Sequence, residues 1–153
     1  MLAYVVALLL GVVAGLRGMM APAAVSWAAR LGVLPLQSTR LAFLGFSFTP
    51  YVFSLLAIAE LVTDQLPQTP SRKVPMQFGA RIVSGAFCGT AVTLPSGGWI
   101  AGLALGAIGT VIGTLDGAAA RVALARSFGT DRPAALIEDV VAIGGSALLM
   151  GVL

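Results

Sequence analysis

The chain has 153 residues, of which 58% are hydrophobic and 10% are charged, with a formal net charge of +3. A soluble domain usually carries about 25% charged residues, so this composition excludes an ordinary soluble domain and predicts one membrane domain of α-helices over residues 1–153. The basic residues stand between apolar runs, so membrane topology explains the positive charge and nucleic acid is not expected as a partner.

The first apolar segment runs from about Leu2 to Ala29. It is too long for one straight span of about 20 residues. The sequence "GLRG", residues 15–18, and then Pro22 interrupt it, so we expect a break or kink there. The stretch from the break to Ala29 is expected to be tilted or partly re-entrant. A polar link, residues 30–40, follows.

The second apolar segment runs from Leu41 to about Leu66, and Pro50 is expected to kink its first half. Its last turns carry Glu60 and Asp64, which are four residues apart and therefore share one face of a helix. The sequence "PQTPSRKVPMQ" comes next. Its three prolines and two basic residues predict the clearest loop of the chain.

Three further segments complete the predicted bundle. The third is Phe78–Leu94, the fourth is Trp99 to about Ser127, and the fifth is Ala134–Leu153. The turns between them are "PSGG" and "GTDRP". The sequence therefore predicts an all-α, polytopic membrane bundle of about five transmembrane helices, some of them broken at glycine or proline.

Lysine and arginine counts set the expected orientation. With a cytoplasmic N-terminus, the link between the second and third segments and the link between the fourth and fifth are cytoplasmic as well. Six basic residues then lie on the cytoplasmic side and two on the other, which the positive-inside rule favours. The six are Arg72, Lys73, Arg81, Arg121, Arg126 and Arg132, and the two are Arg30 and Arg40. A first segment that crossed twice would reverse this orientation.

Glycines recur mostly at four-residue spacing in the fourth segment, at positions 98, 102, 106, 109, 113 and 117. Gly11 and Gly15 in the first segment, and Gly85 and Gly89 in the third, repeat the spacing. Small residues in this pattern let helix backbones approach closely in lipid. They predict packing inside the bundle, with a self-association face for a homo-oligomer as the alternative.

An inverted repeat is a further hypothesis. "VVAGLRG" in the first segment resembles "VIGTLDG" in the fourth. Three intervening crossings would place the two copies in opposite orientations, as in many transporters.

Eight ionisable residues stand in or beside apolar runs, where a charge is expensive unless it is paired or hydrated. Arg17 follows about 15 apolar residues and needs a carboxylate partner. We expect a polar centre, or substrate or ion pathway, made of Arg17, Glu60, Asp64 and Asp116. The other four are interpreted as structural ion pairs or interfacial anchors: Arg81, Arg121, Glu138 and Asp139.

The sequence "DGAAAR", residues 116–121, resembles the opening of the motif of CDP-alcohol phosphatidyltransferases. In that family, aspartates on two helices bind divalent metals and position a CDP-linked lipid. The motif requires an aspartate three residues before Asp116, where this chain has Gly113, and a glycine nine residues after Arg121, where it has Thr130. One matching carboxylate of four cannot hold two metal ions, so a chance resemblance is the better interpretation.

Three stretches resemble a second family. They are "GLRGMMAPAAVSWAARLG", "AELVTDQLPQTPSR" with "ARIVSGAFCGTA" after it, and "IEDVVAIGGS" near the end of the chain. The chain is similar there to a family of small bacterial integral membrane proteins catalogued only as a domain of unknown function. The resemblance implies a multi-span helical fold and transfers no catalytic or binding role. The matching stretches contain Arg17, Glu60, Asp64, Pro67, Arg81 and Glu138.

These observations favour a small transporter or permease-like protein with a polar intramembrane centre. The first alternative is a metal-dependent lipid-modifying enzyme around Asp116, Glu138 and Asp139, and the second is a structural or accessory membrane subunit. The chain has no histidine, and its one cysteine is Cys88, so no metal, cofactor or catalytic residue is predicted. The expected partner is membrane lipid, and the expected location is the bacterial cytoplasmic (inner) membrane, with several passes and a cytoplasmic N-terminus.

Overall fold

A computed structural model describes residues 1–66 and 73–153. Every regular element in these two stretches is a helix, as the composition predicts. The helices, with η marking 3₁₀ helices, are α1 (Leu2–Leu16), α2 (Met20–Arg30), η1 (Ala42–Gly45), α3 (Thr49–Thr63), α4 (Pro75–Thr93), η2 (Leu94–Ser96), α5 (Trp99–Phe128) and α6 (Asp131–Val152). The part of the predicted loop that holds Pro67 and Arg72 lies outside the described residues.

Two of these helices, α5 and α6, are long and apolar enough to cross a membrane. α1 and α3 are also apolar, but each has 15 residues and is shorter than a typical span. The fold class is thus all-helical, while the arrangement of five spans stays a prediction.

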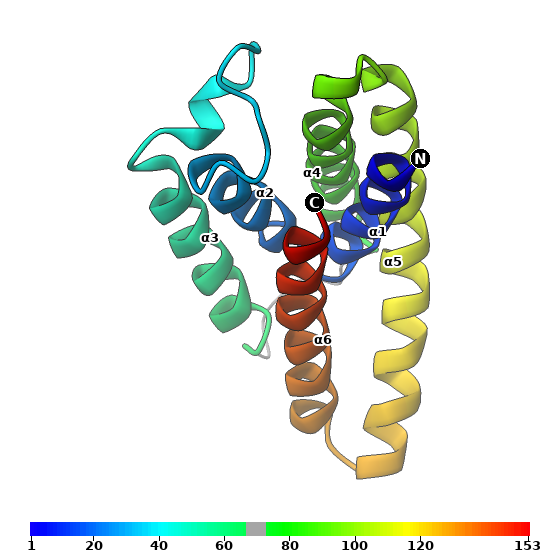
Figure 1. Ribbon diagram of the computed structural model, residues 1–153. Helices are drawn as coiled ribbons and strands as arrows, with labels where there is room; N and C mark the ends of the chain where they lie inside the picture. The colour runs from blue at the N-terminus through cyan, green and yellow to red at the C-terminus, as the bar shows by residue number, and fades with distance from the viewer. Residues whose placement is uncertain (67–72) are drawn as a thin grey trace.

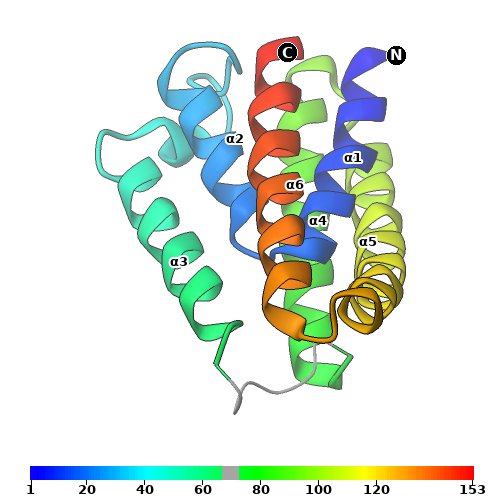
Figure 2. The same cartoon turned by 90° about the horizontal axis from the view of Figure 1, so that it is seen from below.

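The first apolar segment forms two helices. α1 ends at Leu16, Arg17 has an extended backbone (φ −140°, ψ 109°), and α2 begins at Met20. Figures 1 and 2 show α1 running into the bundle and α2 turning back toward the end from which α1 came. The predicted break is confirmed, and the stretch that follows it is a returning helix rather than a tilted continuation.

The second segment begins as a helix later than predicted. α3 starts at Thr49 with Pro50 in its first turn, a position at which the missing N–H of proline is not needed. The expected kink at Pro50 is therefore wrong, because this proline begins the helix. The residues before it form η1 and turns, and the Thr49 hydroxyl donates a hydrogen bond of 2.7 Å to the Phe43 carbonyl.

Both chain ends lie at the same end of the bundle (Figures 1 and 2). Tyr4 of α1 lies against Gly98 in the turn before α5. The end of α3 and the start of α4, which border the link between them, are at the opposite end, because Asp64 and Arg81 both reach the end of α1. The expectation that the N-terminus and this link share a side is wrong, because the return of α2 adds one change of direction.

The return of α2 also determines the relative orientation of the two similar glycine motifs, one in α1 and one in α5. Gly11 of α1 lies against Gly106 of α5, and Gly15 lies against Thr110 and Gly113. Residue numbers rise together along both helices, so α1 and α5 run parallel. The two motifs are therefore not inverted copies.

Glycines bring α1, α4 and α5 into backbone contact. A Cβ added to Gly106 would meet the Gly85 carbonyl of α4, and one added to Gly109 would meet the Leu8 carbonyl of α1. The predicted packing role of the α5 glycines is confirmed within the chain. Because α1 and α4 already cover this face, a second copy of the chain would have to associate through another surface.

Candidate functional site

Arg17 is the largest side chain that is completely buried, with 0% of its surface exposed. It occupies the break between α1 and α2, where the chain changes direction. Its Nε donates a hydrogen bond of 2.7 Å to Asp139 Oδ1 on α6, and its guanidinium also pairs with Asp64 at the end of α3. Glu138 lies 3.8 Å from Arg17 Nη2. Carboxylates from two different helices thus neutralise one buried cation.

Arg81 and Glu60 occupy the two helix ends at this break. Arg81 of α4 donates hydrogen bonds of 3.0 and 2.7 Å to the carbonyls of Gly15 and Leu16, the last carbonyls of α1. The carboxylate of Glu60 on α3 accepts hydrogen bonds of 2.8 Å from the amides of Gly18 and Met19, directly before α2. A cation at a helix C-terminus and an anion at a helix N-terminus both match the helix dipole.

Arg81 also joins the two pairs into one network. Its Nη2 lies 3.1 Å from Glu60 Oε1 and 3.5 Å from Asp64 Oδ2. We call Arg17, Glu60, Asp64, Arg81, Glu138 and Asp139 the charged cluster. Arg81 is 4% exposed and both Glu138 and Asp139 are 7% exposed, so these charges are largely removed from water. Burial on this scale is tolerated only where charges are paired and hydrogen-bonded.

Arg121 lies at the rim of the charged cluster. Its Nε donates a hydrogen bond of 2.9 Å to Asp131 Oδ1, and its Nη1 lies 3.6 Å from Glu138 Oε2. Asp131 is more than half exposed. This pair connects the C-terminal part of α5 to the first turn of α6 at the surface.

The structure brings together most of the residues that the sequence analysis singled out. Of the three partners expected for Arg17, Asp64 pairs with it directly and Glu60 binds the adjacent backbone. Asp116 is different, because it is exposed on α5 and forms no ion pair with any described residue. Asp116 therefore does not belong to the polar centre.

Asp139 and Arg81, expected only as structural ion pairs or anchors, lie at the middle of the cluster. Two polar side chains were missed altogether. The amide of Gln65 donates to Asp139 Oδ2 at 3.3 Å, and the buried hydroxyl of Ser84 donates to the Gly18 carbonyl. Ser84 follows Arg81 by three residues on α4, and that spacing on one helix face was an available signal.

The residues proposed for a metal-dependent enzyme do not assemble. Within residues 1–66 and 73–153, no group of three or more histidine, cysteine, aspartate or glutamate side chains could hold a metal ion. Asp116, Glu138 and Asp139 are among the residues covered by that search. The geometry gives no support to the lipid-modifying alternative.

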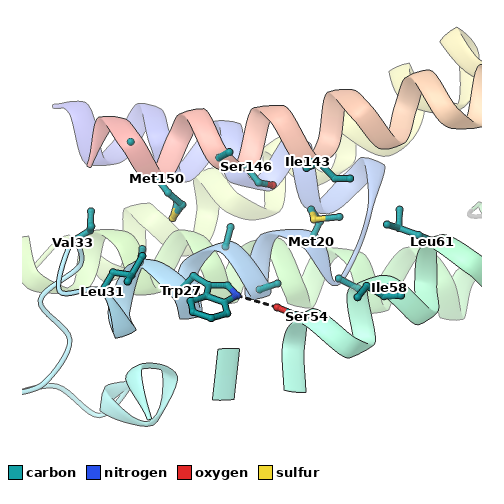
Figure 3. A pocket seen from close by; sticks show the side chains of 16 residues that line it. Met20, Trp27, Leu31, Val33, Ser54, Ile58, Leu61, Ile143, Ser146 and Met150 are labelled. Atoms are coloured by element: carbon teal, nitrogen blue, oxygen red, sulfur yellow. Dashed lines mark hydrogen bonds between the residues drawn. The ribbon is translucent and has the colours of Figure 1, made fainter. Parts of the chain in front are cut away.

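A cavity of about 600 Å³ lies beside the charged cluster. It is lined by side chains of α2, α3 and α6 and by Leu31 and Val33, which follow α2 (Figure 3). At one end it reaches Met20, which follows the Met19 amide bound by Glu60, and Leu61, which follows Glu60 itself. No protein-family profile, curated protein or solved structure matches this chain.

Proposed function

We propose that this chain is a small multi-pass membrane protein of the transporter or permease type. The observation that carries the proposal is Arg17, a completely buried cation in a helix break, neutralised by carboxylates from α3 and α6. Ionisable groups inside a membrane bundle are expensive and commonly mark substrate or ion pathways. The resemblance to a family of small bacterial membrane proteins agrees with this class and adds no substrate.

The break resembles the discontinuous helices of secondary transporters, where helix ends face the transported group. Here Glu60 occupies the amides before α2, and Arg81 occupies the last carbonyls of α1. α3 supplies Glu60 and Asp64 and packs chiefly against α2 and η1. We infer that α3 is the moving element, since its departure would remove Glu60 and Asp64 from the neighbourhood of Arg17 and Arg81 and let an anionic solute take their place.

The proposed location is the bacterial inner membrane, with a revised orientation. The start of α4 and the turn between α5 and α6 lie at the end of the bundle opposite the N-terminus (Figure 1). Lys73 precedes α4, and Arg126 and Arg132 flank that turn, whereas Arg30 and Arg40 belong to the end of α2 and the link after it, on the side of the N-terminus. The positive-inside rule then places the α3–α4 link in the cytoplasm and both chain ends outside. Lys73→Cys in a Cys88→Ser background should resist an impermeant maleimide applied to intact cells. Labelling from outside would reverse the orientation.

Water access to the charged cluster tests the transport proposal itself. Ser84 contacts the helix break, while Cys88 lies one turn further along α4 and is also buried. In proteoliposomes, a small charged methanethiosulfonate should modify Ser84→Cys in the Cys88→Ser background. Wild-type Cys88 is the matched control and should stay unmodified.

An accessory or structural role is the second candidate, and one observation favours it. The charges of the cluster pair with one another, and the adjacent cavity has apolar walls. If Ser84→Cys stays as protected as Cys88, the cluster is closed to water and the accessory role replaces the transport proposal.

A further inference from the structure

The cavity between α2, α3 and α6 has walls that are mostly apolar. Its polar side chains are those of Trp27, Ser54 and Ser146. Trp27 Nε1 donates a hydrogen bond of 3.0 Å to Ser54 Oγ, drawn as a dashed line in Figure 3. The Ser146 hydroxyl donates to the Ala142 carbonyl of its own helix at 2.7 Å. Since Trp27 and Ser146 each donate a hydrogen bond and Ser54 accepts one, and all other wall residues are apolar, the cavity suits a hydrocarbon rather than a polar solute.

The length of the cavity matches one leaflet of a bilayer. On α2 it extends from Met20 to Leu31, which at a rise of 1.5 Å per residue is about 16 Å. The hydrocarbon core of a bilayer is about 30 Å thick, so one leaflet contributes about 15 Å. An extended acyl chain that entered from the outer end would therefore reach the neighbourhood of the charged cluster.

The two ends of the cavity carry different charges. At the outer end, Arg30 directly precedes the wall residue Leu31, is exposed, and forms no ion pair with any described residue. At the inner end, Leu61 follows Glu60 and is three residues from Asp64. The charged cluster at this end has four carboxylates and two guanidinium groups. An anionic headgroup would therefore be attracted by Arg30 and repelled by the net negative charge of the cluster, so its orientation is fixed by charge.

We propose that this cavity binds one acyl chain of an anionic phospholipid of the outer leaflet, with the phosphate beside Arg30 and the chain end near Leu61. The occupant follows from three observations: mostly apolar walls whose three polar side chains form hydrogen bonds, a leaflet-long groove, and the exposed guanidinium of Arg30 at the outer mouth. The proposal rests on the membrane location given above and not on transport.

Trp27 is a built-in reporter of the occupant. In a Trp99→Phe variant Trp27 is the remaining tryptophan, and phosphatidylglycerol with a dibrominated acyl chain can be titrated into the protein in detergent micelles. We expect saturable quenching of Trp27. Ala147, an exposed wall residue, is then changed to Phe to fill the cavity. This change should weaken binding by about tenfold or more, the loss expected when two methylene groups lose their apolar contacts.

Matched variants separate the cavity from unspecific partitioning. Ala104 is an exposed alanine on α5 outside the cavity, so Ala104→Phe should leave the titration unchanged. Ala24→Leu on α2 is a second way to fill the cavity if Ala147→Phe fails to fold. Quenching that does not saturate, or that folded cavity-filling variants leave unchanged, would overturn the proposal.

The headgroup is tested with Arg30→Gln. The preference for dibrominated phosphatidylglycerol over the matching phosphatidylcholine should fall by about fivefold, the effect of one basic residue near a membrane surface. Arg126→Gln, at the opposite end of the bundle, should leave the preference unchanged. Binding of dibrominated free fatty acid without binding of either phospholipid would overturn the phospholipid assignment. The modification of Ser84→Cys measures water access to the charged cluster and does not depend on lipid binding. Failure of the transport proposal can therefore be distinguished from failure of the lipid-binding proposal.

Discussion

The two sides of this bundle are held together by opposite means. On one side, α1, α4 and α5 meet through glycines, with backbone against backbone, and Arg81 is the charged residue of α4 that reaches the carbonyl end of α1. On the other side, α3 and α6 stand around an apolar cavity, and ion pairs at the helix break connect them. Backbone packing leaves little freedom to move, whereas ion pairs can exchange partners. The comparison suggests that a fixed half supports a half that can rearrange.

The largest expected effect comes from removing the cation that joins the second side. Arg17→Leu leaves Asp64 and Asp139 without their buried partner, and should lower the free energy of unfolding by about 3–5 kcal/mol. Unfolding in mixed dodecyl sulfate and detergent micelles measures it. Arg126→Leu, an exposed arginine on α5, is the control. Equal stability of the two variants would show that the ion pairs do not hold α3 and α6.

Glu60→Gln tests the contacts at the two helix ends and is expected to lower the free energy of unfolding less than Arg17→Leu does. The amide keeps an acceptor for one of the two backbone N–H groups before α2 but loses the negative charge facing Arg81. We expect a loss of about 1.5–3 kcal/mol, the usual range for a hydrogen bond to a charged group. The same unfolding titration measures it, and Gln77→Glu on α4 provides a charge change outside the cluster. A loss below the error of the titration would contradict the assigned cap.

Gly106→Ala tests the first side. The added methyl group would meet the Gly85 carbonyl, and an overpacked core site typically loses about 1–3 kcal/mol. Gly144→Ala on α6 is the matched control, because an added Cβ there has nothing within 4 Å. The thermal midpoint in detergent should fall for the first variant and hold or rise for the second. Identical midpoints would mean that the backbones of α4 and α5 are further apart than described.

The smallest expected effect lies at the rim. Arg121→Gln breaks the pair with Asp131, which is more than half exposed, so the loss should be about 0.2–1 kcal/mol and should shrink as salt is added. Unfolding titrations at low and high ionic strength measure it. A loss as large as that of Arg17→Leu, unchanged by salt, would place Arg121 in the buried cluster.

Local rules predicted part of this structure. The break at Arg17 followed from a charged residue between glycines, and its pairing with Asp64 followed from the need to neutralise it. The exposure of Asp116 could not be predicted, because the buried Gly109 precedes it by seven residues and the two therefore share nearly one face of α5. The return of α2 could not be predicted, because its direction depends on how Glu60 and Arg81, on later helices, hold the two helix ends.

The separation of the charged partners along the chain has a consequence for synthesis. Asp64 follows Arg17 by 47 residues and Asp139 follows it by 122. At about 5–20 residues per second, the partner on α6 leaves the ribosome roughly 6–24 s after Arg17 does. In the proposed membrane location, hydrocarbon offers Arg17 no counter-charge before Asp64 is made, and the second carboxylate is absent until α6 follows, so the arginine is expected to stay near headgroups or in the insertion machinery. The α1–α2 hairpin is therefore expected to reach its final depth last, although it is made first.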